Sequence, residues 1–294
     1  MNFYDCFMYY DEDMLLDLRL NILNNYVKKF VITESTYLHN GSPKKLKFDI
    51  KKFSKFKDKI KYIVVDKHPD NIEELNSGDT QHQKNSKLLI NALKRENFQR
   101  NKLQDGLSEA SDEDLVIISD VDEIPDLKNF IHKDMFSFFK QKMFYYKFNL
   151  LHEKIVWVGS RACKKKYLLS PQWLRNIKNK SYQFWRFDIA FSKKKYRKIN
   201  FIDNGGWHFS SIKSPEDIHF KMSNFLHHVE YEVSGLGVDD MKKMVNEKKV
   251  LYNHSADKRD VNKWKASVPL KKVTNLELPK YLIENIEKYK VWLD

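Results

Sequence analysis

LVIISDVDEIP, residues 115–125, is an apolar run that ends abruptly in Asp120, Val121, Asp122 and Glu123. An unbroken run of Leu, Val and Ile bounded by polar residues is typical of a strand covered on both faces, as in a parallel or mixed α/β sheet. The carboxylates would then lie at the C-terminal end of this strand, the edge at which open α/β sheets bind ligands. Because Val121 separates the two aspartates, an extended backbone would project Asp120 and Asp122 to the same side.

Two carboxylates on one side of a strand end suit a divalent metal ion. Proteins bind Mg²⁺ and Mn²⁺ through a few carboxylates, with water and substrate phosphates filling the other positions. The alternative is an acidic turn after a strand, with Asp126 as the N-cap of a helix beginning at Leu127. The sequence GGWHFS, residues 205–210, offers His208 as a third metal ligand, because paired glycines let the backbone turn tightly before it. A hydrogen-bonded structural histidine is the alternative there.

Apolar runs that end in an acidic residue recur along the first half of the chain. They occupy residues 30–33 before Glu34, 62–65 before Asp66 and 115–119 before Asp120. Between them, apolar residues recur at helical spacing over residues 14–27 and 87–103, and Gly106 is placed to end the second helix. Strands that alternate with helices predict a wound α/β sheet. We also expect an exposed loop over residues 71–84 and a terminal amphipathic helix from Pro279.

Composition and charge narrow the function classes. The 294 residues carry 53 Lys and Arg against 40 Asp and Glu, a formal net charge of +13, which favours anionic partners such as nucleotide phosphates or anionic lipid head groups. Neither a GxGxxG fingerprint nor a phosphate loop is present, so the sequence does not indicate a classical dehydrogenase or a P-loop nucleotidase. Two basic runs, residues 164–166 and 193–198, lack the motifs that accompany a specific nucleic-acid site. Two cysteines are too few for a disulfide framework or a thiolate zinc site.

Neither a secretion signal nor a membrane span can be recognised. No stretch approaches the roughly 18 uninterrupted apolar residues that a transmembrane helix needs. We therefore expect a cytoplasmic protein that can contact an anionic membrane peripherally through its basic surface. Tryptophans are dense in the second half, at Trp157, Trp173, Trp185 and Trp207, and we expect most of them to pack in the core.

Several longer motifs resemble one family. They are YDCFMYYDEDMLLDLRLNIL at residues 4–23, VITES at 31–35, RENFQRNKLQDGL at 95–107, DLVIISDVDEIP at 114–125, GGWHFS at 205–210 and LPKYLIENIEKYKVWL at 278–293. In this order they resemble family seventeen of the glycosyltransferases, the family of the enzyme that adds the bisecting N-acetylglucosamine to glycoproteins. The resemblance covers nearly the whole chain, and RENFQRN followed by ISDVDEIP is far more specific than a lone DxD.

The resemblance implies a single GT-A type domain over residues 1–294: an α/β fold with a mixed, mostly parallel sheet flanked by helices. Residues 1–126 would form the nucleotide-sugar-binding half, and 127–294 the acceptor-side half with its C-terminal helix. It also implies a metal-dependent, inverting transfer of a sugar from a UDP-sugar donor to a hydroxyl of an oligosaccharide, glycolipid or glycoprotein acceptor. We expect that sugar to be N-acetylglucosamine.

Asp120 and Asp122 match the family's DxD position and would hold Mn²⁺ or Mg²⁺ against the donor diphosphate, and His208 would complete the site. The chemistry agrees, because a divalent cation stabilises the negative charge that grows on the departing nucleoside diphosphate.

Further residues could contact the donor. Arg95 and Arg100 precede the metal strand, and a guanidinium can bind phosphate oxygens or the ribose edge bidentately. The alternative is an ordinary helical ion pair, such as Arg100 with Glu96. Glu34, at the end of its strand, is expected to contact the nucleoside. Asp66 is the weaker candidate for the same role.

An inverting transfer needs a general base within hydrogen-bond reach of the acceptor hydroxyl. The candidate carboxylates are Glu216, Asp188, Glu123 and Glu153. We favour Glu216 over Asp188, because the turn at Gly205 brings its segment toward the donor.

Two other functions remain open at this point. One is a non-catalytic glycan- or nucleic-acid-binding protein on the same fold, against which the intact DVD and GGWH clusters speak. The other is a metal-dependent phosphodiesterase that uses the same carboxylates to activate water. Acceptor-dependent product formation separates a transferase from both.

Overall fold

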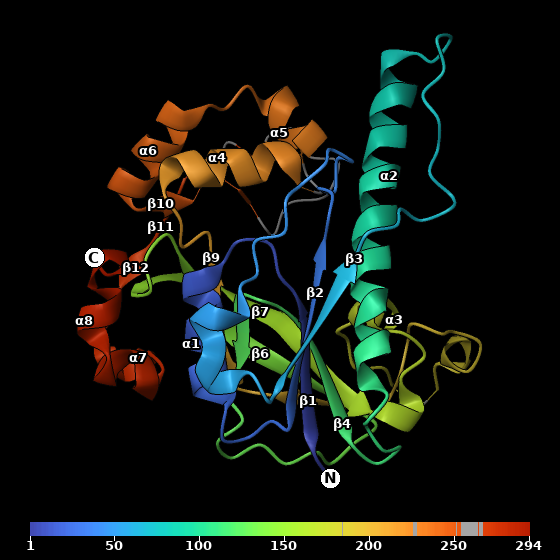
Figure 1. The fold of residues 1–294 in the computed structure, drawn as a ribbon, viewed down its shortest axis with the longest axis vertical. Coiled ribbons are helices and arrows are strands. Elements are labelled where there is room, and N and C mark those ends of the chain that lie inside the picture. Colours follow the sequence, from blue (N-terminus) through green and yellow to red (C-terminus); the bar gives the residue numbers. More distant parts are fainter. Residues whose placement is uncertain (184, 226–227, 251, 254–263, 265–266) are drawn as a thin grey trace.

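The computed structural model describes residues 1–183, 185–225, 228–250, 252–253, 264 and 267–294. One mixed β-sheet forms its centre, and helices lie on the faces and edges of that sheet (Figure 1). Among the described residues the sheet contains ten strands: β1 (Phe3–Met8), β2 (Lys29–Ser35), β3 (Ile60–Val65), β4 (Leu115–Asp120), β5 (Glu123–Pro125), β6 (Phe136–Tyr145), β7 (Leu150–Lys164), β8 (Ile199–Ile202), β9 (Gly206–Ser210) and β12 (Lys271–Lys272). A separate antiparallel pair joins β10 (Lys249–Val250) to β11 (Val268–Pro269).

The strand order makes the sheet curl. Along its main path the order is β3-β2-β1-β4-β7-β6-β9-β5, and the first four strands of that path run parallel. Strand β7 is antiparallel to both neighbours, β9 is parallel to β6, and β5 is antiparallel to β9. Only Val121 and Asp122 join β4 to β5, yet three strands lie between them in the order. The sheet therefore bends round until β5 returns to β4, and the acidic turn lies where the curl closes.

A layer of helices covers the carboxyl ends of the parallel strands. The α-helices of the described residues are α1 (Asp13–Leu23), α2 (Gln81–Asn101), α3 (Pro171–Asn176), α4 (Pro215–Asn224), α5 (His228–Ser234), α6 (Val238–Glu247), α7 (Lys280–Glu284) and α8 (Ile286–Tyr289). In Figure 1, α4, α5 and α6 gather beyond the carboxyl ends of β1, β2 and β3, and α2 stands beside them. The rings of Tyr10, just after β1, and Phe225, just after α4, meet at 4.9 Å. Helix α4 thus covers the carboxyl ends of the parallel strands, the edge at which open α/β sheets bind ligands.

The predicted fold class is confirmed. The three apolar runs form β2, β3 and β4, and the two predicted helices correspond to α1 and α2. Helix α2 begins earlier than predicted, because a capping box starts it: the side chain of Thr80 accepts from the backbone N–H of Gln83, and the side chain of Gln83 accepts from that of Thr80. Strand β1, between β2 and β4, was not predicted.

One local prediction was wrong. Gly106 does not end α2; it lies in a 3-10 turn, Lys102–Leu107, where an added Cβ would come within 2.3 Å of Val31 Cγ1. Close packing against β2, rather than helix termination, requires glycine there. The alternative of a helix capped by Asp126 is not borne out, since the residues after Asp126 form a turn.

The surface segments agree in part with expectation. Residues 71–80 form the loop, but Gln81 and the three residues after it already belong to α2. The C-terminal segment is two short helices, α7 and α8, rather than one, and it docks through the buried side chains of Leu282 and Tyr289. None of the described helices combines the length and apolar character that crossing a membrane requires.

Candidate active site

Arg19 of α1 fixes the backbone of the acidic turn between β4 and β5. Its fully buried guanidinium forms a two-bond ion pair with Asp5 of β1, at 2.5 and 2.7 Å. Its Nη1 group donates to the carbonyl oxygens of Asp120, Val121 and Glu123, at 3.1, 3.3 and 2.6 Å. A buried guanidinium needs acceptors for its donors, and these carbonyls supply them. The side chains of the turn therefore project from a rigid backbone.

A cavity of about 200 Å³ opens beside this turn. Segments far apart in sequence contribute to its lining, among them Tyr10, Arg100, Asp120, Asp122, His208 and Lys221. They come from the end of β1, from α2, from the turn, from β9 and from α4. The fold thus brings together the DxD segment and the GGWHFS segment, as the sequence predicted.

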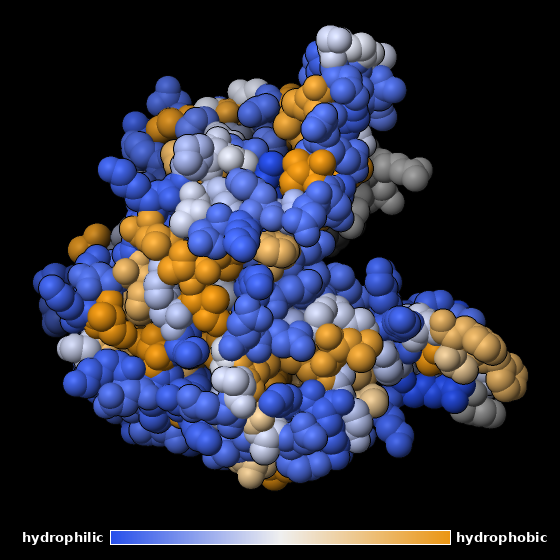
Figure 2. Space-filling model, turned by 45° about the vertical axis from the view of Figure 1, so that its right-hand side comes forward, coloured by the Kyte–Doolittle hydropathy of each residue, from blue (hydrophilic) through white to orange (hydrophobic). Residues whose placement is uncertain are grey.

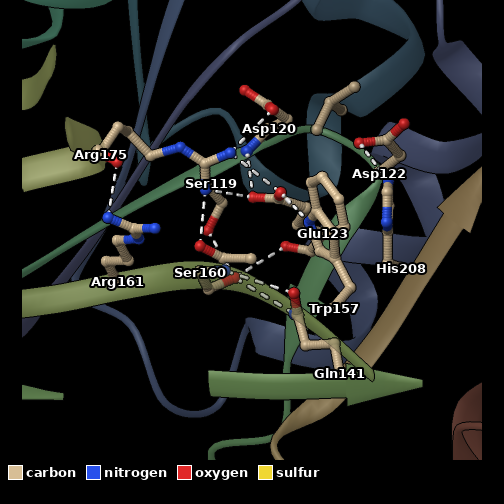
Figure 3. Close-up of polar contacts among 12 residues, drawn as sticks. Ser119, Asp120, Asp122, Glu123, Gln141, Trp157, Ser160, Arg161, Arg175 and His208 are labelled. Atoms are coloured by element: carbon tan, nitrogen blue, oxygen red, sulfur yellow. Dashed lines mark hydrogen bonds and ion pairs between the residues drawn. The ribbon is translucent and has the colours of Figure 1, made fainter. Parts of the chain in front are cut away.

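Asp122 and His208 face each other in the cavity (Figure 3). Asp122 Oδ1 and His208 Nε2 are 3.6 Å apart, which is longer than a normal hydrogen bond. Burial disfavours the charged form of each group, but the attraction between the two groups is stronger than this effect. Asp122 therefore raises the pKa of His208, and His208 lowers the pKa of Asp122. Among the described residues, His208 Nδ1 is buried and has no hydrogen-bond partner.

Asp120 is held by two arginines. Its Oδ1 accepts from Arg100 Nη2 at 3.0 Å. Its Oδ2 accepts from Arg175 Nη2, also at 3.0 Å (Figure 3). Burial opposes ionisation of this carboxylate, yet Arg175 and Arg100 outweigh it and hold the pKa of Asp120 well below its usual range. Arg175 also donates to both oxygens of Glu123, at 2.6 and 3.0 Å. Arg175 thus clamps the two ends of the acidic turn.

Glu123 positions Trp157. Its fully buried carboxylate accepts from Trp157 Nε1 at 2.6 Å and from the backbone N–H of Asp120 at 2.9 Å. The indole of Trp157 lies 5.0 Å from the His208 ring, between centroids. Because Glu123 accepts four hydrogen bonds from three residues and does not line the cavity, it supports the site rather than accepting a proton there.

Lys221 of α4 brings a cation into the cavity. Its Nζ lies 4.0 Å from Asp122 Oδ2 and 4.0 Å from Glu12 Oε1, so it pairs with both without a close hydrogen bond to either. Burial disfavours its charge, but Asp122 and Glu12 outweigh burial and raise the pKa of Lys221. The ammonium group is therefore charged at neutral pH, with donors directed into the cavity.

The family model of glycosyltransferase family 17 matches residues 1–294, the whole chain. The chain belongs to glycosyltransferase family 17. No curated protein matches it. The protein is therefore a glycosyltransferase, as the motifs indicated, and the cavity beside the DxD turn is its candidate active site.

Two residues of this glycosyltransferase suit a divalent metal ion. In the part of the chain that the structure describes, no group of three or more His, Cys, Asp or Glu side chains has metal-binding geometry. Asp120 is engaged by Arg100 and Arg175, which leaves Asp122 and His208 as the facing pair. The carboxylate suits either Mn²⁺ or Mg²⁺ and the imidazole suits Mn²⁺ better, because Mg²⁺ prefers oxygen ligands; diphosphate oxygens and water would complete the shell. The donor set fits an ion that binds together with its substrate.

The structure brings only one of the other predicted donor contacts to the cavity. Arg100 lines it, whereas Arg95 donates to the carbonyl oxygen of His39 at 3.1 Å and lies outside. Glu34 is fully buried, and its carboxylate accepts from Lys44, from Tyr62 and from two backbone N–H groups. It anchors the loop after β2 instead of reaching a nucleoside. Asp66 is exposed and does not line the cavity.

The favoured general bases do not reach the cavity. Glu216 lies exposed in the first turn of α4 and pairs with Lys242 at 3.2 Å. Asp188 is exposed and pairs with Arg186 and Lys195, both at 2.7 Å. Glu153 is exposed too and pairs with a lysine, Lys271.

Helical periodicity could have shown that Lys221, and not Glu216, is the residue of this helix that faces the cavity. Ser214 followed by Pro215 is the usual start of a helix, and here the Ser214 side chain caps α4. The buried Ile218 then defines the inner face, which Lys221 shares at three residues' distance and Glu216 does not. No comparable sequence signal marks Arg175, which lies in a six-residue helix far from the DxD motif.

Proposed function

We propose that this glycosyltransferase moves a sugar, N-acetylglucosamine in our expectation, from a UDP-sugar to a hydroxyl of a glycan acceptor, with inversion and with a divalent metal ion. The observation that carries the metal dependence is the charge of the cavity. Its lining holds four carboxylates, Glu12, Glu96, Asp120 and Asp122, against the cations Arg100 and Lys221, and Arg175 adds a third cation behind Asp120. A diphosphate would be repelled by this lining unless a further cation entered with it.

Asp122 and His208 would hold that cation, and Asp120, fixed by its two arginines, would add negative charge beside it. The ion would act as a Lewis acid on the diphosphate. The protein's own contribution is to keep this donor set in place before the substrate arrives, through the Arg19 and Arg175 clamps.

Lys221 is suited to the leaving group. In the transfer, the acceptor oxygen forms a bond to the anomeric carbon while the bond from that carbon to the phosphate oxygen breaks. The bonding electrons go to the diphosphate, and the hydroxyl proton goes to a base. A charged ammonium directed into the cavity can bind the diphosphate oxygens as their charge increases. The base is to be sought among the lining carboxylates rather than at Glu216 or Asp188.

A phosphodiesterase would use the same carboxylates to activate water, and a binding protein would need no metal. Family membership favours transfer over both. The test that separates them is product formation that depends on an acceptor, because a transferase can also hydrolyse its donor slowly.

We also propose peripheral contact with an anionic membrane through residues 178–198. This segment holds eight basic residues and one acidic residue. Phe187 and Phe191 on it are 79% and 92% exposed, and Trp185, expected in the core, is 55% exposed. Figure 2 shows apolar side chains at the tip of a projection whose remaining surface is hydrophilic. Exposed aromatic rings among cations suit a surface of anionic lipid.

The donor site is tested by calorimetric titration of UDP, with GDP for comparison, in Mn²⁺ and then in excess EDTA. We expect UDP to bind only with Mn²⁺, and Asp122→Ala to abolish this binding while circular dichroism stays unchanged. GDP preference would change the donor and keep the chemistry. Equal binding in EDTA, or normal binding by the variant, would contradict the metal assignment.

A further inference from the structure

A second cavity adjoins the candidate active site. It measures about 260 Å³, and we call it the methionine pocket after Met222, Met241 and Met244 in its lining. Tyr145 and Ile218 complete much of its wall. These side chains belong to a hydrophobic cluster formed by β6, α4 and α6.

Three elements border both cavities. Trp157 of β7 lines each of them. On β9, His208 faces the first cavity and Ser210, two residues on, faces the second. On α4, Lys221 lines the first cavity and Met222 the second. A molecule in the methionine pocket would therefore be next to the first cavity, and the Trp157 ring would separate it from Asp122 and His208.

The size and chemistry of the pocket point to an apolar ligand. Protein interiors contain few voids larger than a water molecule, and an apolar cavity of about 150 Å³ is enough to bind benzene. No Asp, Glu, Lys, Arg or His side chain lines this pocket, among the residues that the structure describes. The polar groups of the lining are tyrosine and serine hydroxyls and indole N–H groups, and some are already engaged: Tyr146 donates to the Lys249 carbonyl and Trp157 to Glu123. A bare oligosaccharide would lose more hydrogen bonds to water there than the remaining groups replace, and that loss opposes binding.

We propose that the methionine pocket binds an apolar group attached to the acceptor sugar, so that the acceptor is a glycolipid or another glycoside with an apolar aglycone. This inference rests on the proposed function, because it places the acceptor beside the donor cavity. The acceptor sugar would lie near Trp157 and present its hydroxyl toward Asp122 and His208. Among the expected acceptors, oligosaccharide, glycolipid and glycoprotein, it selects the glycolipid class.

The test compares two probes that differ only in the aglycone, methyl and hexyl β-D-glucopyranoside, titrated into the full chain below any micelle concentration. Each buried methylene adds roughly a factor of four in affinity. We therefore expect hexyl to bind at least about tenfold tighter than methyl, even with partial burial. Met222→Leu should keep the preference, and Met222→Glu, which puts a carboxylate in the pocket, should remove it. No preference in the native protein, or one that Met222→Glu leaves unchanged, would overturn the inference.

UDP titration in Mn²⁺ on the same three proteins separates this inference from the donor assignment. UDP binding without a hexyl preference overturns the methionine pocket alone. A hexyl preference without UDP binding overturns the proposed function and, with it, the acceptor role of the pocket. Where methyl and hexyl glycosides of glucose, galactose or mannose give product, the hexyl form should show the lower KM, with kcat less affected.

Discussion

Replacing Lys221 by methionine separates binding of the diphosphate from stability of the fold. Methionine keeps much of the length of the side chain and removes its charge. In the structure this ammonium meets Asp122 and Glu12 only at 4.0 Å, and a quarter of the side chain, 26%, is exposed. Asp122 keeps His208 beside it and Glu12 keeps the backbone N–H groups of Tyr10 and Asp11, so loss of the ammonium should lower the free energy of unfolding by only about 1–2 kcal/mol.

The effect on the ligand should be larger. A hydrogen bond from a charged donor to a phosphate oxygen contributes about 2 kcal/mol, which corresponds to roughly a thirtyfold loss in UDP affinity. Uridine has no diphosphate, so its affinity should not change. Binding of Mn²⁺ alone should be equal or stronger, because Lys221 no longer competes for Asp122.

Calorimetry with UDP, uridine and Mn²⁺, together with urea denaturation, checks these expectations. Lys242→Met is the matched control, because Lys242 is an exposed lysine that pairs with Glu216 outside the cavity. The reasoning is refuted if Lys221→Met binds UDP as tightly as the native protein, or if it weakens uridine and UDP equally.

Three further predictions concern the acidic turn, the residue just before β4 and the proposed membrane contact. Arg175→Met should lower the free energy of unfolding in urea by about 3 kcal/mol, because it leaves Glu123 buried without its cation; an unchanged midpoint would contradict this. Asp114→Asn should cost about 1.5 kcal/mol at pH 7, since donors from Asn2 and Ser111 outweigh burial and lower the pKa of Asp114 to about 2. The contribution of this depressed pKa is complete above the unfolded pKa of about 3.9 and is lost as the pH falls toward 2, so the difference between variant and native protein should shrink in acid. Phe191→Ser should weaken sedimentation with phosphatidylglycerol vesicles and leave UDP binding intact; equal sedimentation would remove residues 178–198 as the contact.

The sequence predicted the parts of the site that depend on local pattern. An apolar run ending in DVD indicated a buried strand with carboxylates at its end, and β4 has that form. The two aspartates share a cavity for another reason than the one predicted, however. The strand stops at Asp120 and a turn carries Asp122, so alternation along an extended backbone does not align them. Their placement depends on Arg19, which binds the turn although it lies about a hundred residues before it in the sequence.

Residues whose roles come from tertiary contacts were missed or misplaced. Glu34 looked like a nucleoside ligand because it ends a strand at the right edge, but the following loop folds back and uses its carboxylate. Arg175 gave no signal, since only the curled sheet brings its short helix to the acidic turn. Glu216 and Lys221 are on one helix, and the apolar Ile218 marks its inner face, so helical spacing could have favoured Lys221 over Glu216.

The charges of the residues that line the candidate active site predict that the metal ion and the donor bind cooperatively. Without the ion, the four lining carboxylates repel a diphosphate. Without the diphosphate, the ion finds, among the residues that the structure describes, only Asp122 and His208 as close protein ligands. Each should therefore raise the affinity of the other. By linkage, the factor by which Mn²⁺ tightens UDP must equal the factor by which UDP tightens Mn²⁺. A coupling of at least about tenfold, measured in both titration orders, is expected from repulsion of this kind. Asp122→Asn should reduce it toward one, because the amide is neutral and a weaker ligand. Independent binding of the two would mean that Lys221 and Arg100 suffice for the diphosphate.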